Sequence, residues 1–163
     1  PRVLALGDVA GGAWLAHEAM GEGEVAADAL AGEADAFDTR AIPAVVYTDP
    51  QVAWCGLTEA EAERQEREVQ VERFPWSASG RAHTLGASAG FTKLLFDPAD
   101  DRLLGAGIVG RQAETLVAEA VIAIEMGAVA RDLEMSIHPH PTLSETIGEA
   151  AASFHGVATH VAH

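Results

Sequence analysis

A predicted β-hairpin constrains the fold of this chain more than any other feature of the sequence. Two runs rich in apolar and β-branched residues, Phe91–Phe96 and Arg102–Val109, flank the turn-forming sequence Asp97-Pro98-Ala99-Asp100-Asp101. Strands joined by so short a loop lie antiparallel to each other, because a parallel pair needs a much longer crossover. We therefore expect an antiparallel sheet at the centre of the fold.

The remaining patterns place further strands before a set of helices. Strands are expected over residues 44–48, 52–55 and 69–76, and the capping-box pattern Thr58-x-x-Glu61 predicts a surface helix that runs to about Glu68. Apolar residues recur every three or four positions over 113–126, which predicts a helix with one buried face, and shorter helices are expected over 129–135 and 143–153. This order indicates an α+β fold, an antiparallel β-sheet flanked by helices.

The start of the chain has a different character. Residues 3–7 predict a short buried strand and residues 14–30 a helix, after which residues 32–43 mix acidic residues, Gly and Pro without periodicity. We place a boundary near residue 40. The sequence thus predicts two parts, residues 1–40 and residues 41–163.

Charge and composition exclude several classes of function. The 163 residues have a formal net charge of -15, which repels phosphate backbones and anionic lipids, so nucleic acid and membrane surfaces are poor candidates for a partner. The sequence has neither a signal peptide nor an apolar run long enough to span a bilayer, and the expected compartment is the cytoplasm. Its one cysteine, Cys55, excludes an internal disulfide and a four-cysteine zinc site.

A glycine-rich motif offers a first candidate site. Gly105-Ala-Gly107-Ile-Val-Gly110 matches the dinucleotide-binding pattern G-x-G-x-x-G, and Asp132 follows at a suitable distance for a ribose contact. However, the strand that enters the motif belongs to the hairpin, and no second parallel strand follows the next helix. We favour the alternative that these glycines permit close packing between the sheet and a helix.

Asp8 and the residues around Ala16 form a second candidate. An aspartate just beyond a strand can accept hydrogen bonds from sugar-like hydroxyl groups, and the start of the following helix offers unpaired backbone N–H donors. The alternative is that Asp8 is a loop or capping residue.

The third candidate is the segment His138-Pro139-His140-Pro141 with Glu145. Its prolines disfavour helix and keep the two rings on a stiff extended stretch, while a helix beginning near Leu143 returns Glu145 toward them. A carboxylate that accepts from one imidazole nitrogen fixes the tautomer and leaves the other nitrogen free to take a proton.

Two alternatives remain open for this segment. The pattern Thr142-x-x-Glu145 is also a capping box, which would explain the glutamate without any catalytic role. The histidines could also bind a metal together with His155, His160 or His163, but the chain shows no recognisable ligand spacing, and we expect no metal site.

Four stretches of the chain together carry a family resemblance. The run His140-Pro-Thr-Leu-Ser-Glu145, followed by Thr-Ile-Gly-Glu-Ala-Ala, resembles the C-terminal signature of dihydrolipoamide dehydrogenases, in the pyridine nucleotide-disulfide oxidoreductase family. The other stretches that agree are residues 5–8 with 15–17, residues 47–50 with 56–59, and residues 105–110. The resemblance covers essentially the whole chain, although the family's N-terminal glycine-rich FAD motif and its Cys-x4-Cys pair are absent from it.

The resemblance implies an enzyme that uses FAD and NAD to oxidise dihydrolipoamide to lipoamide. It implies that His140 is the base, that Glu145 orients it, that Asp8 contacts the ribityl chain of the flavin, and that Ala16 is a backbone donor to the flavin ring. Residues 41–163 would be the interface domain of a homodimer, and residues 1–40 would belong to the FAD-binding domain.

The resemblance also implies a partner protein, and it implies that this chain alone lacks parts that the activity requires. The partner is the lipoyl-bearing acyltransferase of a 2-oxoacid dehydrogenase complex. We expect residues 1–163 alone to be inactive and to hold neither FAD nor NAD. The alternatives are a freestanding nucleotide-binding module and a purely structural dimerisation module.

Overall fold

The computed structural model describes residues 3–34 and 36–160. The chain divides into two compact units, Pro1–Ile42 and Pro43–His163, and each is described by itself. The boundary expected near residue 40 falls close to this division.

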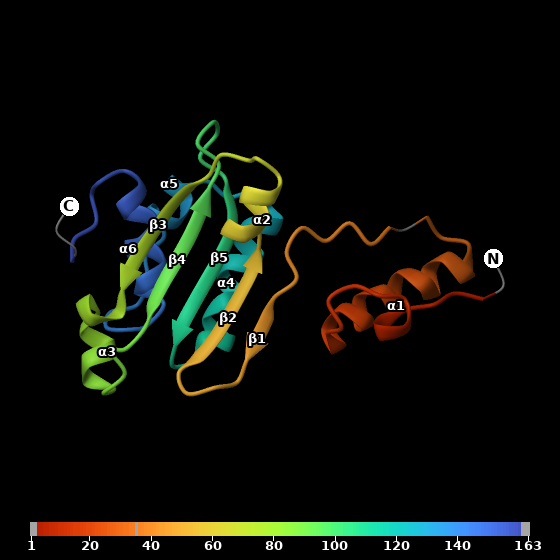
Figure 1. Ribbon diagram of the computed structural model, residues 1–163, viewed down its shortest axis with the longest axis horizontal. Coiled ribbons are helices and arrows are strands. Elements are labelled where there is room, and N and C mark those ends of the chain that lie inside the picture. Colours follow the sequence, from red (N-terminus) through yellow and green to blue (C-terminus); the bar gives the residue numbers. More distant parts are fainter. Residues whose placement is uncertain (1–2, 35, 161–163) are drawn as a thin grey trace. The chain divides into compact units, whose positions relative to one another are not determined.

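The second unit is built on one five-stranded sheet (Figure 1). The strands lie in the order β1-β2-β5-β4-β3, and every neighbouring pair is antiparallel. The predicted α+β fold with an antiparallel sheet is therefore confirmed. The strands are β1 (Ala44–Val46), β2 (Gln51–Gly56), β3 (Gln70–Pro75), β4 (Phe91–Phe96) and β5 (Leu103–Gly110).

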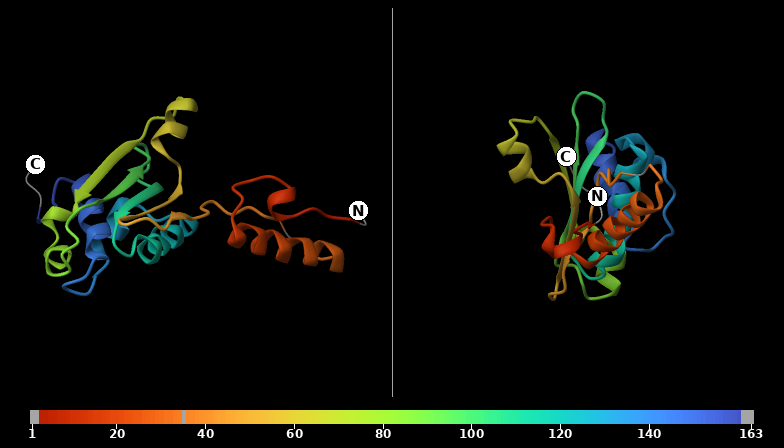
Figure 2. Two further views of the ribbon diagram at one scale, coloured as in Figure 1. Left: turned by 60° about the horizontal axis from the view of Figure 1, so that its bottom comes forward. Right: turned by 90° about the vertical axis from the view of Figure 1, so that its right-hand side faces the viewer.

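Helices cover one face of this sheet and a short helix lies on the other side (Figure 2). Helix α4 packs on β2 and β5, and helix α6 packs on β3 and β4. The core lies between these helices and the sheet, where Phe74, Leu94, Ile108, Val117 and Ile147 are buried. The helices are α2 (Glu59–Arg64), α3 (Gly80–Thr84), α4 (Ala113–Met126), α5 (Ala130–Met135) and α6 (Glu145–Phe154), with a 3₁₀ turn, η2 (Trp76–Ala78), before α3.

Local sequence signals account for several of these boundaries. Thr58 and Glu61 form the predicted capping box, since the Glu61 N–H donates to the Thr58 hydroxyl and the Thr58 N–H donates to Glu61 Oε2 at 2.9 Å. Helix α2 ends at Arg64, earlier than expected, because Glu66 has a φ of 52° and cannot continue it. Helix α4 ends where predicted, at Gly127 in the left-handed region.

The glycines of the G-x-G-x-x-G pattern lie inside β5, paired with β2 and β4, and not in a turn between a strand and a helix. A Cβ at Gly105 would lie 1.9 Å from the Leu57 carbonyl oxygen, and one at Gly110 would lie 2.2 Å from the Trp76 ring. Gly105 and Gly110 therefore permit close packing, although their neighbours are the Leu57 backbone and the Trp76 ring and not an α-helix as expected. The geometry does not match a dinucleotide fingerprint, whose glycines open the turn onto a helix.

The first unit consists of a 3₁₀ turn, η1 (Gly7–Val9), and helix α1 (Ala16–Ala31). The strand expected over residues 3–7 was wrong, because residues 3–6 are irregular and Gly7 begins η1. A strand needs a neighbour for its ladder of hydrogen bonds, and the described residues of this unit include no other strand.

Candidate functional site

The candidate site is built on the loop between α5 and α6, residues 136–144, which we call the His140 loop. His140 Nδ1 lies 2.8 Å from Oε1 of Glu145, the first residue of α6. The His140 side chain is 77% exposed, whereas that of Glu145 is 27% exposed. The structure therefore brings together the two residues that the sequence proposed as base and orienter, with the ring open to solvent.

The second carboxylate oxygen of Glu145 has a different partner. The Thr142 N–H donates to Oε2 at 2.6 Å, as in one half of a capping box. The other half is absent, because the Thr142 hydroxyl donates to the Pro139 carbonyl at 2.7 Å and the helix begins only at Glu145. Glu145 thus has two structural roles: one carboxylate oxygen accepts from the loop backbone, and the other binds the imidazole of His140.

Glu145 is ionised at neutral pH. Partial burial alone would raise the pKa of this carboxyl, but the hydrogen bonds from the Thr142 N–H and the His140 ring outweigh it, and the pKa is lowered. Since a carboxylate can only accept, His140 Nδ1 carries the proton of this hydrogen bond. In the neutral ring Nε2 is then the acceptor, which is the arrangement that a base requires.

A buried series of hydrogen bonds fixes the start of α6 to the sheet. Thr146 donates to the Leu143 carbonyl at 2.7 Å, its Oγ1 lies 2.8 Å from Thr92 Oγ1 on β4, and Trp76 Nε1–H donates to Thr92 at 3.0 Å. Because Thr146 already donates to Leu143, the Thr92 hydroxyl donates to Thr146, and each of these three side chains has its partners. No local sequence pattern indicates this network, because its members lie far apart in the chain.

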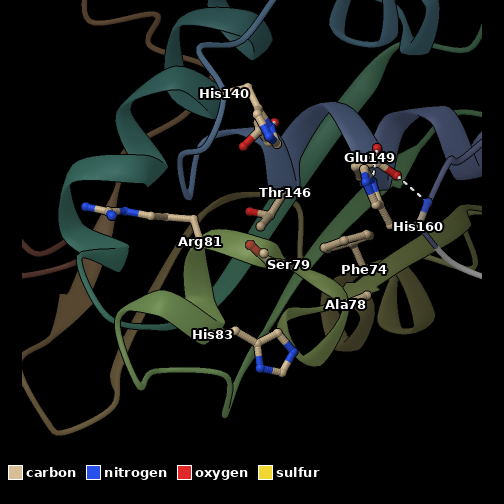
Figure 3. Close-up of a pocket in the computed structure, with 11 residues that line it drawn as sticks. Phe74, Ala78, Ser79, Arg81, His83, His140, Thr146, Glu149 and His160 are labelled. Atoms are coloured by element: carbon tan, nitrogen blue, oxygen red, sulfur yellow. Dashed lines mark hydrogen bonds and ion pairs between the residues drawn. The ribbon is translucent and has the colours of Figure 1, made fainter.

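A pocket of about 210 Å³ opens beside His140 (Figure 3). Phe74 and Ala78 provide apolar walls, and Arg81 extends from α3. A second imidazole, His160, also faces this pocket, with Nδ1 2.8 Å from Oε1 of Glu149 on α6. Glu145 and Glu149, one turn apart on the same helix, thus each bind a histidine at this pocket.

The other histidines considered as metal ligands are also paired with glutamates. His138 Nε2 lies 2.7 Å from Glu119 Oε1, and His155 Nδ1 lies 2.7 Å from Glu134 Oε2. Within residues 3–34 and 36–160, no three His, Cys, Asp or Glu side chains are arranged to hold a metal ion. His163 lies outside the described residues.

Asp8 and Ala16 belong to the first unit. Asp8 is an exposed residue of η1, and Ala16 is the exposed first residue of α1. Leu15 makes no side-chain cap hydrogen bond to α1, and Ala16 is at the helix start, where an α-helix leaves backbone N–H groups without an intrahelical acceptor. Both residues are accessible to a polar ligand.

Cys55 lies on β2 and is buried. Burial raises the pKa of its thiol to about 12, against a weaker opposing hydrogen bond with the backbone of Ala106. A thiol that stays protonated at neutral pH is a poor nucleophile. This chain therefore has no cysteine suited to thiol-disulfide exchange.

Most of the chain matches a known protein family. Residues 42–151 match the family described as "Pyridine nucleotide-disulphide oxidoreductase, dimerisation domain". The chain therefore belongs to this family of flavoprotein disulfide reductases. The helices of the described residues include none that is long and apolar enough to cross a membrane.

Similar curated proteins include dihydrolipoyl dehydrogenases. The chain is 52% identical over 161 residues to the dihydrolipoyl dehydrogenase of Thermus scotoductus. The matched region covers 99% of this chain and 35% of that protein. It is 52% identical over 158 residues to dihydrolipoyl dehydrogenase 2 of Haloarcula marismortui, which covers 97% of this chain and 34% of that protein. The chain thus spans about a third of the length of these relatives.

Solved structures share the fold. LpdA from Mycobacterium tuberculosis superposes with a TM-score of 0.85 at 24% identity, over 92% of this chain and 33% of that one. The HOCl-induced flavoprotein disulfide reductase RclA from Escherichia coli gives 0.83 at 25% identity, over 91% of this chain and 34% of that one.

Proposed function

We propose that this chain is the dimerisation part of a dihydrolipoyl dehydrogenase and that its His140–Glu145 pair is the base for oxidation of dihydrolipoamide. The observation that carries the proposal is the 2.8 Å contact between His140 Nδ1 and Glu145, which leaves Nε2 of an exposed ring free to accept a proton. The identity to curated dihydrolipoyl dehydrogenases supports the choice of substrate.

The chemistry of the dithiol explains why a base is needed. A thiolate attacks a disulfide far better than a thiol does, and alkyl dithiols are mostly protonated at neutral pH. The thiol proton moves to His140 Nε2, the thiolate forms a new S–S bond with one disulfide sulfur, and the other sulfur leaves as a thiolate. Glu145 stabilises the imidazolium that results. The second thiol of the substrate then attacks this mixed disulfide, which releases lipoamide and leaves the original disulfide reduced to a dithiol. A base of this kind contributes typically ~10²–10⁴-fold in rate.

The disulfide must come from residues outside this chain, because Cys55 is its one cysteine and is buried. In our proposal the ring of His140 reaches a disulfide of the other subunit of a homodimer that forms through residues 41–163. The 77% exposure of the His140 side chain supports this arrangement, since a ring buried in its own subunit could not reach another.

The cofactors of the proposed enzyme are FAD and NAD. Asp8 and Ala16 fit such a role, because both are accessible and they supply an acceptor and a backbone donor. Asp8 would bind hydroxyl groups of the ribityl chain, and the Ala16 N–H would donate to the flavin ring. A bound flavin would supply the two-electron chemistry between dithiol and NAD. On this proposal residues 1–40 belong to the FAD-binding domain.

The proposed partner is the lipoyl-bearing acyltransferase of a 2-oxoacid dehydrogenase complex, which would present the dithiol. The expected cytoplasmic location and the expected inactivity of residues 1–163 alone stay predictions.

Replacing the base in the complete flavoprotein tests the proposal. His140→Gln should lower kcat for dihydrolipoamide oxidation by ~10²-fold or more. Reduction of an artificial electron acceptor by NADH should continue, because that reaction transfers no dithiol proton. Glu145→Gln should have a smaller effect of the same kind. If dithiol turnover by His140→Gln stays within a few-fold of the parent, the chain has a purely structural dimerisation role.

A further inference from the structure

His138, the other histidine of the His140 loop, is bound by groups from several elements. Its Nε2 lies 2.7 Å from Glu119 Oε1 on α4, and its side chain is only 12% exposed. On the α6 side the ring lies against Gly148, where a Cβ would come within 3.1 Å of Nδ1. The absence of a side chain at Gly148 thus makes room for the ring between the two helices.

His138 is largely enclosed, whereas the side chain of His140 is 77% exposed. The hydrogen bond with Glu119 raises the pKa of His138 despite partial burial, and a backbone hydrogen bond with Ser136 and the charge of Glu145 contribute in the same direction. His138 Nε2 is occupied by the contact with Glu119, and Nδ1 lies on the Gly148 side of the ring. The ring is thus enclosed between α4 and α6 and is poorly placed to take a proton from a substrate.

From this geometry we infer that the His138–Glu119 pair is a positioning device that sets the place of the His140 ring; the inference rests on the proposed function. A single residue, Pro139, separates the two histidines, and its ring fixes φ. The Pro139 carbonyl also accepts the hydrogen bond from the Thr142 hydroxyl at 2.7 Å. A shift of His138 would therefore pass through a stiff link to His140.

The pair completes a three-way attachment of the His140 loop. Glu145 binds the loop at the head of α6, the hydroxyl of Thr142 binds it internally, and Glu119 binds it to α4. Neither Glu119 nor His138 touches the atoms that react in the proposed mechanism. A displacement of about 1 Å in a catalytic group can nevertheless lower a rate by ~10²-fold.

The test uses the complete flavoprotein and its dithiol oxidation. We expect His138→Gln and Glu119→Ala to lower kcat by ~10-fold or more, with NADH-driven reduction of an artificial acceptor unchanged within about two-fold. Glu119→Gln keeps an oxygen that accepts from His138 and should retain most of the turnover. Loss of both activities together, or equal loss in Glu119→Gln and Glu119→Ala, would overturn the inference.

A matched control comes from the His155–Glu134 pair. Its nitrogen and oxygen are also 2.7 Å apart, but it joins the end of α6 to α5 and lies outside the His140 loop. His155→Gln should therefore leave dithiol turnover unchanged within about two-fold. If His155→Gln lowers it as much as His138→Gln does, the effect is general stability and not positioning.

A double-mutant cycle separates the inference from the function on which it rests. In a His140→Gln background, His138→Gln should cause no further loss, since there is no base left to position. If the two losses multiply, His138 acts independently of His140 and the inference fails. If His140→Gln alone has little effect, the proposed function fails first, whatever His138→Gln does.

Discussion

The two units of the chain use apolar residues in opposite ways. Of the described residues of the unit Pro1–Ile42, only Glu18 and Ala41 are buried, whereas Trp14, Met20 and Leu30 are largely exposed. In the unit Pro43–His163, Leu94 and Ile147 are fully buried between the sheet and its helices. An apolar side chain stabilises a fold only where a second layer covers it. The described residues of its unit give helix α1 no such layer, which agrees with our proposal that residues 1–40 belong to another domain.

The largest expected contrast comes from one substitution made in both units. Leu94→Ala empties a fully buried site on β4 and should lower the free energy of unfolding by about 2–5 kcal/mol. The side chain of Leu30 is 64% exposed, so Leu30→Ala should change the free energy of unfolding by less than about 0.5 kcal/mol. Urea denaturation measures both. Similar losses at the two sites would show that α1 shares the core.

Glycine-to-alanine substitutions should lower stability in the second unit and raise helix stability in the first. Gly105→Ala would force a Cβ against the Leu57 carbonyl, and we expect a cost of about 1–3 kcal/mol or more. A Cβ added at Gly23, within α1, would meet no atom within 4 Å, so Gly23→Ala should favour the helix by about 0.5–1 kcal/mol. Thermal unfolding and helicity from circular dichroism report the two effects. A tolerated Gly105→Ala would contradict the close packing of β5.

Helix caps provide a smaller contrast. Helix α2 has a complete capping box, whereas α1 has no side-chain cap at Leu15. Thr58→Ala should cost about 1 kcal/mol, and it should also raise the pKa of Glu61, which hydrogen bonds from Thr58 now lower. Leu15→Ser should increase the helicity of α1 by a comparable free energy. Amide hydrogen exchange in the two helices would detect both changes, and unaltered exchange would argue against them.

The smallest expected effect is a pH dependence that resides in the second unit. The hydrogen bond with Glu119 raises the pKa of His138 above its ordinary value of 6.5. The stability contributed by the pair is therefore complete below pH 6.5 and is lost as the pH rises through the raised folded-state value. We expect about 1 kcal/mol or less, because solvent screens a partly exposed pair. Glu119→Gln should remove this contribution, and deletion of residues 1–40 should leave it unchanged, as urea titrations at about pH 6 and about pH 9 would show.

Much of the second unit followed from local patterns. The five-residue loop at 97–101, the periodicity of 113–126 and the Thr58 capping box each act within a few residues, so their elements could be predicted. The strand over residues 3–7 was predicted by the same reasoning and is absent, because a strand also depends on a neighbour that its own sequence does not specify.

For the candidate site, the sequence by itself determined the stiffness of the His-Pro-His-Pro segment and the return of Glu145 toward His140, since both depend on residues close together in the chain. Only the tertiary structure decided that Glu119 binds His138 and that Trp76, Thr92 and Thr146 anchor α6 to the sheet. It also decided that Gly105 and Gly110 of β5 pack against the Leu57 backbone and the Trp76 ring. These contacts join residues that the sheet topology brings together from distant parts of the chain, and no local propensity encodes such a meeting.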